Sequence, residues 1–343
     1  MIVRYKLEER EERSLSPFAT LSTESKGTLF SVEKPNDCTI FMRDKYSIQN
    51  AAAFKGLSEK AHASQVSLTT DKGRRSRLDY SLKCAELSRE LAEKLTLNED
   101  LAEAISLGLE LGQPPFGRIG ERVLREMFYD GFDHGSQSLR VVDHLENSSG
   151  INLSYEVRNG ILKHSGNWPF NQQSKNLSSY PFTLEGQLAG FVDKFLLLNY
   201  LIEDGVACGY IKASQLPVEI TAVLGDNFTH RIDHFAGSIT KSSQNSSTIK
   251  LDPATAAAFY ALYEFIYVKL FLNTQYVIGE QQIINRFHNV YQFFYDHPEE
   301  LVYYTDQCSD EELEFELERK IIDVLASLSE VKLLEIANNV KRA

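Results

Sequence analysis

The sequence has few cysteines, and they are scattered. Only four occur in 343 residues, Cys38, Cys84, Cys208 and Cys308, and none forms a CxxC pair. A disulfide framework or a zinc knuckle needs cysteines at short, regular spacing, so the pattern excludes both. It indicates reduced thiols in a cytosolic protein.

Long apolar runs are also absent. The most apolar stretch, Phe259–Leu272, is interrupted by Glu264 and Lys269 and is too short to cross a bilayer. The first residues are charged from Arg4 onward and contain no apolar core of a signal peptide. We therefore predict a cytoplasmic protein with no membrane partner.

Basic residues are the minority among the charged ones. Lys and Arg number 36 against 48 Asp and Glu, a formal net charge of −12. Broad nucleic-acid binding needs a clustered basic face, and this composition argues against one. A local basic pocket for one polyphosphate stays compatible with it.

Helical periodicity, in contrast, is abundant. Leucines and alanines recur at helical spacing between Leu78 and Leu95, and Asn98 is a predicted N-cap for a helix that stops at Gly112. Asp252 followed by proline predicts the start of an aromatic-rich helix. Further helices are predicted over Gly117–Tyr129, Ser136–Glu146, Tyr155–Leu162, Leu184–Ile202 and Glu311–Val340. The fold class is mainly α.

Some segments lack this periodicity. Ser165–Tyr180 and Ala236–Lys250 are rich in Ser, Thr, Asn and Gln, which predicts long surface loops or disorder. Short strand candidates are Thr28–Ser31 and Thr39–Met42.

One stretch carries a family resemblance. Leu109-Glu-Leu-Gly-Gln-Pro-Pro-Phe-Gly-Arg118 resembles the His-Asp-Leu-Gly-His-Pro-Pro-Phe-Gly-His run of HD-domain dGTP triphosphohydrolases. Other family runs match in order at Arg43-Asp44, Ala53-Phe54, Gln65-Val66, Arg75–Leu78, Gly131–His134, Gln137–Arg140, Tyr155–Arg158, Gly160–His164 and Glu185–Gln187. The resemblance implies an HD-domain (HD/PDEase-like) helical bundle with additional C-terminal helices.

The same resemblance suggests a division of the chain. Residues 1–60 are expected to form an N-terminal arm and the first helices, and residues 61–205 a degenerate HD-domain core. Residues 206–343 are expected to form a C-terminal helical region packed on that core.

The metal-binding positions of the family are altered here. The family holds its metal with a His, an adjacent His-Asp pair and a distant Asp; this chain has Tyr80, Leu109, Glu110 and Asp193 at those positions. Leucine has no donor atom and a neutral tyrosine is a poor ligand. Where the family would use a divalent metal such as Mg or Mn, the resemblance predicts no metal and no cofactor for this chain.

The acid–base residues are altered as well. The family's His after Phe-Gly, which pairs with a Glu to handle water, is Arg118, while the partner Glu121 remains. Arginine does not accept a proton at neutral pH. The losses fall on the site while the surrounding Pro-Pro-Phe-Gly run is retained, which predicts an inactive relative.

Three polar residues of the family pocket remain as candidate ligand contacts: Gln65, Arg77 and His134. The planar donors of Arg77 suit a phosphate. The alternative is that Arg77 pairs with Glu110 or Asp193 in place of the metal. For His134, a structural role is favoured over a catalytic one.

Three functions follow. The first is a pseudoenzyme with an assembly, regulatory or nucleotide-sensing role, as a homo-oligomer or a hetero-oligomer with an active paralogue, with a dNTP as its ligand. The second is a working dNTP triphosphohydrolase, converting dGTP to deoxyguanosine and tripolyphosphate, or another phosphohydrolase with a non-standard site. The third is a protein-interaction module that binds no nucleotide.

Overall fold

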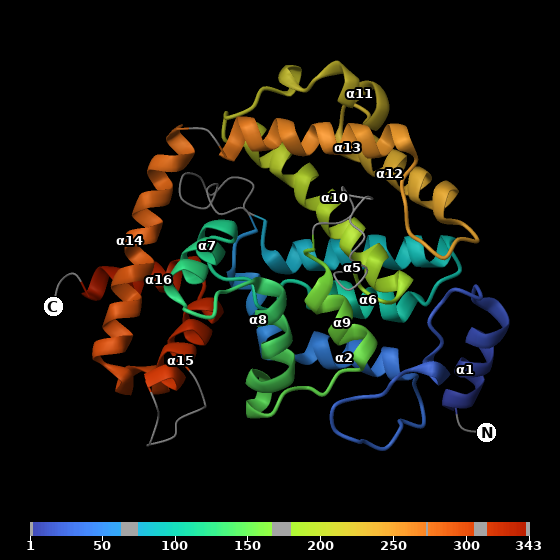
Figure 1. Ribbon diagram of the computed structural model, residues 1–343, viewed down its shortest axis with the longest axis horizontal. Helices are drawn as coiled ribbons and strands as arrows, with labels where there is room; N and C mark the ends of the chain where they lie inside the picture. The colour runs from blue at the N-terminus through green and yellow to red at the C-terminus, as the bar shows by residue number, and fades with distance from the viewer. Residues whose placement is uncertain (1–2, 63–74, 167–179, 272–273, 305–313, 341–343) are drawn as a thin grey trace. The chain divides into compact units, whose positions relative to one another are not determined.

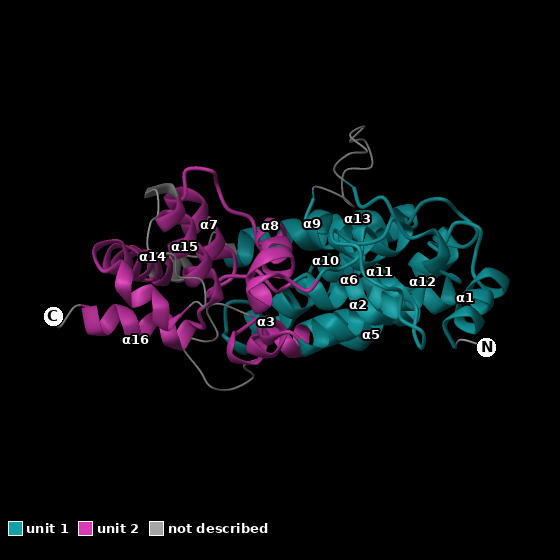
Figure 2. Cartoon of the chain, turned by 90° about the horizontal axis from the view of Figure 1, so that it is seen from below, with its two compact units in different colours: residues 1–50, 81–109, 152–273 teal, residues 51–80, 110–151, 274–343 magenta. Residues whose placement is uncertain are grey.

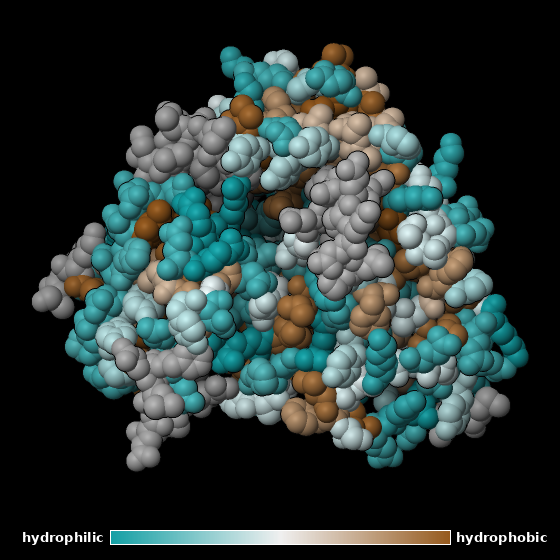
Figure 3. Space-filling model, viewed as in Figure 1, coloured by the Kyte–Doolittle hydropathy of each residue, from teal (hydrophilic) through white to brown (hydrophobic). Residues whose placement is uncertain are grey.

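The protein is mainly helical, as predicted. The structure is a computed structural model that describes residues 3–62, 75–166, 180–271, 274–304 and 314–340 (Figure 1). Within these ranges the only β-type pairings are two isolated bridges, Thr28 with Ser154 and Ala61 with Ser76. None of the described helices is both long and apolar enough to span a bilayer. Figure 3 shows hydrophilic residues over much of the face in view, in keeping with the 24% of charged residues.

The chain divides into two compact units, each assembled from separate segments (Figure 2). Unit 1 contains residues 1–50, 81–109 and 152–273, and unit 2 contains residues 51–80, 110–151 and 274–343. Helix α5 (Arg77–Lys94) begins in unit 2 and continues in unit 1. The expected division at residues 60 and 205 remains a prediction.

In unit 1 the central helix is α6, which packs on α2, α9 and α10. The Asn98 side chain caps α6 by accepting a hydrogen bond of 3.1 Å from the Leu101 N–H, as predicted. Glycines allow the close approach of α6 and α9, because a Cβ on Gly108 would lie 2.4 Å from the Ile161 side chain. The helices of unit 1 are α1 (Val3–Ser14), α2 (Ile40–Asn50), α6 (Glu99–Gly108), α9 (Tyr155–Lys163), α10 (Leu184–Ala207), α11 (Val218–Leu224), α12 (Phe228–Ser243) and α13 (Pro253–Ile266).

An aromatic cluster joins the later helices of unit 1. The rings of Phe195 in α10 and Phe235 in α12 stack with centroids 4.0 Å apart, and Phe259 in α13 lies 5.7 Å from Phe195. All three are fully buried. The predicted start of α13 is confirmed, because the Asp252 carboxylate accepts the N–H groups of Ala254 and Thr255.

Two predictions for unit 1 were wrong. The polar segment Ala236–Lys250 was expected to be a loop, but α12 extends to Ser243, because Arg231, Phe235 and Ile239 recur every four residues and are buried on one side. The strand candidate Thr39–Met42 is the start of α2. Of the other strand candidate, only Thr28 makes an isolated bridge.

In unit 2 the long helix α14 packs on α7, α15 and α16. Phe287, Val290 and Phe294 of α14 are fully buried in the core of this unit. The helices of unit 2 are α3 (Ala52–Gly56), α7 (Arg118–Met127), α8 (His134–Arg140) with the π-helical turn Val141–Leu145, α14 (Thr274–Asp296), α15 (Glu314–Ser327) and α16 (Glu330–Val340).

The predicted helix Glu311–Val340 is two helices. It breaks after Ser327, and Ser329 starts α16 by accepting hydrogen bonds from the N–H groups of Lys332 and Leu333. Most of the other predicted loop, Ser165–Tyr180, lies outside the described residues.

Candidate functional site

In unit 2, backbone hydrogen bonds join the segment that contains Lys60 and His62 to the segment that leads into α5. Lys60 and His62 pair with the segment that leads into α5: the His62 N–H donates to the Arg75 carbonyl and the Arg77 N–H donates to the Lys60 carbonyl, both at 2.9 Å. This pairing aligns the side chains of Lys60, His62 and Arg77 within the same unit.

Arg77 and Glu110 form a buried ion pair. The Arg77 Nη1 donates directly to the Glu110 Oε2, and the exposed fractions of the two side chains are 4% and 6%. Of the alternatives left open by the sequence, a phosphate contact or a pairing with Glu110 or Asp193, the structure shows the pairing with Glu110. A buried charge is tolerated in a protein interior when it has an opposite charge and hydrogen bonds.

His62 lies beside this pair as a neutral imidazole. Burial, followed by the positive charges of Arg77 and Arg75, holds the pKa of His62 well below its usual range. The Tyr80 ring stacks on the His62 ring, with centroids 4.0 Å apart and an interplanar angle of 26°. Tyr80 is 1% exposed, so its ring fills space rather than facing solvent.

Glu121 and His134 form a second pair in unit 2. The Glu121 carboxylate accepts a hydrogen bond from the His134 backbone N–H and lies 3.2 Å from His134 Nδ1. Burial alone raises the pKa of Glu121, but the hydrogen bond and charge of His134, with the charge of Arg125, lower it to about 2. Glu121 is thus ionised at neutral pH and fixes the orientation of the imidazole.

A strained loop joins these two pairs. Phe116 and Gly117 both have positive φ, 60° and 51°, directly before α7. A Cβ on Gly117 would lie 2.6 Å from Arg77 Nη2, so glycine lets the loop approach the guanidinium. The buried Glu330 at the start of α16 holds the loop, because its carboxylate accepts the Phe116 N–H and the Ala61 N–H at 3.0 Å each.

The chain was compared with known proteins. It is 35% identical over 303 residues, 88% of this chain and 85% of the relative, to a deoxyguanosinetriphosphate triphosphohydrolase-like protein of Caldanaerobacter subterraneus subsp. tengcongensis. Similar proteins of the same name occur in Desulfatibacillum aliphaticivorans (36% identical, 78% of this chain, 76% of the relative) and Clostridium perfringens (31% identical, 96% of this chain, 95% of the relative). The chain belongs to the deoxyguanosinetriphosphate triphosphohydrolase-like family.

Two other comparisons add nothing to this assignment. No family model matches the chain. Among solved structures, a hypothetical protein from Aquifex aeolicus has a TM-score of 0.46 and 16% identity, covering 71% of this chain and 59% of that one, a likeness too low to carry an argument.

The residues at the expected metal positions do not fit a divalent cation. Leu109 offers no donor, and the Tyr80 ring is committed to its stack on His62. The Glu110 carboxylate already binds Arg77. Among the residues that the structure describes, no three His, Cys, Asp or Glu side chains are grouped as metal ligands would be.

The remaining predicted positions are placed as follows. Asp193 is buried in α10 of unit 1. Leu109 is also in unit 1, directly after the last residue of α6. Arg118 is exposed at the first residue of α7. Gln65 lies outside the described residues.

Sequence reasoning missed Lys60, His62 and Glu330 as parts of this cluster. Lys60 and His62 precede the Gln65-Val66 match and carry no periodic signal of burial. Glu330 stands at the end of the run Asp323-Val-Leu-Ala-Ser-Leu-Ser-Glu330, where its acidic side chain directly after Ser329 is the signal of a helix start.

Proposed function

We propose that this chain is an HD-domain member of its family with a degenerate metal motif, and that it does not hydrolyse dNTPs. Its role is assembly, regulation or nucleotide sensing in the cytoplasm. The buried Arg77–Glu110 ion pair is the observation that supports this proposal most strongly.

The argument is electrostatic. A buried carboxylate needs a compensating cation, since an isolated buried charge is destabilising by several kcal/mol. Arg77 supplies that charge to Glu110, at the position where the resemblance expects a metal ligand. A guanidinium neutralises a carboxylate, but it neither activates water nor provides an open coordination position. The proposed outcome is a stable pocket without the chemistry of the family.

The same pair argues for weak binding of a triphosphate at this position. Arg77 Nη1 is engaged by Glu110, and its Nη2 faces the His62 carbonyl at 3.5 Å. Redirecting the arginine to a phosphate would leave Glu110 buried without a partner.

One observation favours the second candidate, a phosphohydrolase with a non-standard site. The Glu121–His134 pair keeps the geometry of a carboxylate that orients an imidazole, an arrangement that supports acid–base catalysis. Arg118, His134 and Gln65 would then be contacts to a substrate rather than remnants.

Metal content and hydrolysis of dGTP separate the two candidates. We expect purified protein to contain less than about a tenth of an equivalent of transition metal, and tripolyphosphate release to stay at background in Mg²⁺ or Mn²⁺. The combined restoration of Tyr80→His, Leu109→His and Glu110→Asp is expected to regain metal but little turnover, since Arg118 remains. Hydrolysis by the wild type that Asp193→Ala abolishes would contradict the proposal.

The partner is tested separately. A homo-oligomer, or a hetero-oligomer with an active paralogue, is expected in sedimentation experiments with the purified chain and with that paralogue. Calorimetry with dGTP distinguishes nucleotide sensing from assembly alone. Micromolar binding that Arg77→Ala removes would support sensing and contradict the closed ion pair.

A further inference from the structure

Unit 2 contains a cavity of about 340 Å³ that Lys60 of the polar cluster helps to line. It is framed by α3, the π-helical turn after α8, and α15. Its wall is mixed: apolar side chains such as Leu111 and Val141 stand beside polar and charged ones, among them Lys60, Lys320 and Tyr304. A cavity of this size suits a small organic ligand.

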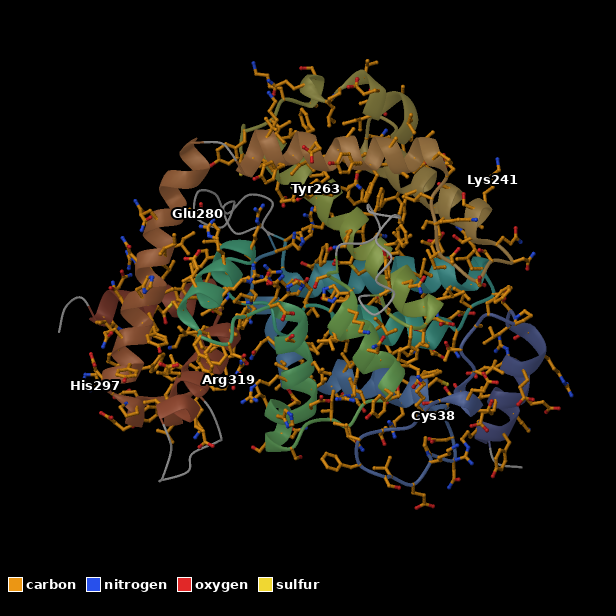
Figure 4. All side chains as sticks on the ribbon, viewed as in Figure 1. Cys38, Lys241, Tyr263, Glu280, His297 and Arg319 are labelled. Carbon is orange, nitrogen blue, oxygen red and sulfur yellow. The ribbon has the colours of Figure 1, made fainter. Side chains whose placement is uncertain are left out.

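The two carboxylates in the wall already have their partners. Asp323 accepts hydrogen bonds from Gln137 at 2.8 Å, from Arg140 at 2.8 Å and from Arg319 at 2.6 Å; Figure 4 labels Arg319 on α15. Glu146 accepts the two backbone N–H groups at the start of α3. Neither carboxylate is left for a cationic ligand.

Lys60 is different. Its side chain is buried, and its amine donates to the carbonyls of Gln113, at 2.8 Å, and Ala326, at 2.7 Å. Lys60 and Ala326 both line the cavity. An ammonium has three N–H donors, and within the described part of the chain only these two acceptors are within hydrogen-bond distance of it.

The charges around Lys60 explain its protonation. Burial, then the charge of Arg77, lowers the pKa of Lys60 to about 7, although the carboxylates of Glu330 and Glu110 oppose this. A neutral amine has two N–H donors, which the two carbonyls satisfy. The charged form has a third donor and an uncompensated charge, and an anionic acceptor in the cavity would satisfy both.

We propose that this cavity binds a small organic carboxylate, whose anionic group accepts the third hydrogen of the Lys60 ammonium. The Arg77–Glu110 pair acts on this site only through its charges on Lys60, so the proposal holds whether or not the chain hydrolyses dNTPs.

The test uses benzoate, which is ionised at every pH employed. Binding to the ammonium form requires Lys60 to take up a proton whenever it is neutral. With a pKa of about 7 in the free protein, titration calorimetry in two buffers of different ionisation enthalpy should give an uptake of about 0.9 proton at pH 8 and about 0.1 at pH 6. The affinity should be about ten-fold weaker at pH 8 than at pH 6.

Matched ligands and variants test whether the ligand's anion and the Lys60 side chain cause the binding and the proton uptake. Benzyl alcohol and benzylamine, which lack the anion, should bind at least about ten-fold more weakly than benzoate. Lys60→Arg keeps a cation that does not titrate, so it should bind benzoate with almost no proton uptake at pH 8. Lys332→Met, on an exposed lysine of α16, is the control and should match the wild type.

The wild-type comparison decides the question even where Lys60→Arg does not fold. Absence of benzoate binding at both pH values, or a proton uptake that is equal at pH 6 and pH 8, would overturn the proposal. Benzylamine binding as tight as benzoate would overturn it as well.

Discussion

Removing one partner of the Arg77–Glu110 pair should destabilise the protein strongly. Arg77→Met leaves the Glu110 carboxylate buried, with an exposed fraction of 6%, and without its cation. Breaking a buried ion pair in this way is destabilising by about 3–5 kcal/mol. Glu110→Gln leaves the buried guanidinium unmatched, so a loss of similar size is expected.

The double variant makes the prediction specific. Arg77→Met with Glu110→Gln removes both charges, and replacing a buried ion pair by neutral groups is often close to neutral. The double variant should therefore be more stable than either single variant, which corresponds to a coupling energy of at least about 3 kcal/mol. Urea unfolding followed by far-UV circular dichroism measures all four proteins, with slopes compared to check that the transition has not changed.

An exposed pair on α1 provides the control. Arg13 and Glu9 form an i,i+4 ion pair with side chains 76% and 52% exposed. Arg13→Met should change stability by less than about 0.5 kcal/mol. A loss below about 1 kcal/mol for Arg77→Met, or a double variant as unstable as the sum of the single ones, would refute the reasoning that the pair is buried and obligatory.

Two further predictions concern unit 2. Glu330→Gln turns one acceptor of the buried carboxylate into a donor that faces an N–H group, so the free energy of unfolding in urea should fall by about 2–4 kcal/mol. Glu335→Gln, at an exposed position of α16, is the control and should leave the free energy of unfolding unchanged. The pKa of Glu121 is lowered from 4.5 to about 2, so its contribution is complete above pH 4.5 and is lost as the pH falls through about 2. Glu121→Gln should therefore lower stability at pH 6 by at most about 3 kcal/mol and should flatten the acid side of the stability curve; an unchanged curve would contradict the pairing with His134.

Local sequence signals predicted much of the fold correctly. The N-caps Asn98 and Asp252 each accept backbone N–H groups at the predicted helix starts. These signals are local, because a cap and the N–H groups it satisfies lie within three residues. The error at α12 arose because serine and threonine composition was weighed above the spacing of buried residues. The error between α15 and α16 was the reverse, because helical spacing was followed through the helix start at Ser329.

The candidate site was only partly predictable. Charge balance made a pairing of Arg77 with Glu110 or Asp193 one of two alternatives, because a buried acid needs a compensating cation. Lys60, His62 and Glu330 did not follow from the sequence, because burial of a charged residue depends on long-range pairings. Glu330 acts on Ala61 and Phe116, 269 and 214 residues away along the chain.

Buried acids in the family-like runs of unit 1 have structural partners. Asp44 accepts the Ser154 N–H, and Glu156 accepts the Lys26 N–H. Glu185, fully buried, accepts the N–H groups of both Thr20 and Asn98. Burial raises the pKa of Asp44 and of Glu185, with the hydrogen bonds opposing it.

Each of these carboxylates ties a loop to a helix, a task that requires no metal and no substrate. Replacing one leaves a buried N–H without an acceptor, which destabilises the protein by about 1–3 kcal/mol for each N–H group. Folding therefore preserves these runs whether or not the protein hydrolyses a nucleotide. In unit 2, Glu110 likewise has a buried partner, the Arg77 guanidinium, whose loss leaves its charge uncompensated.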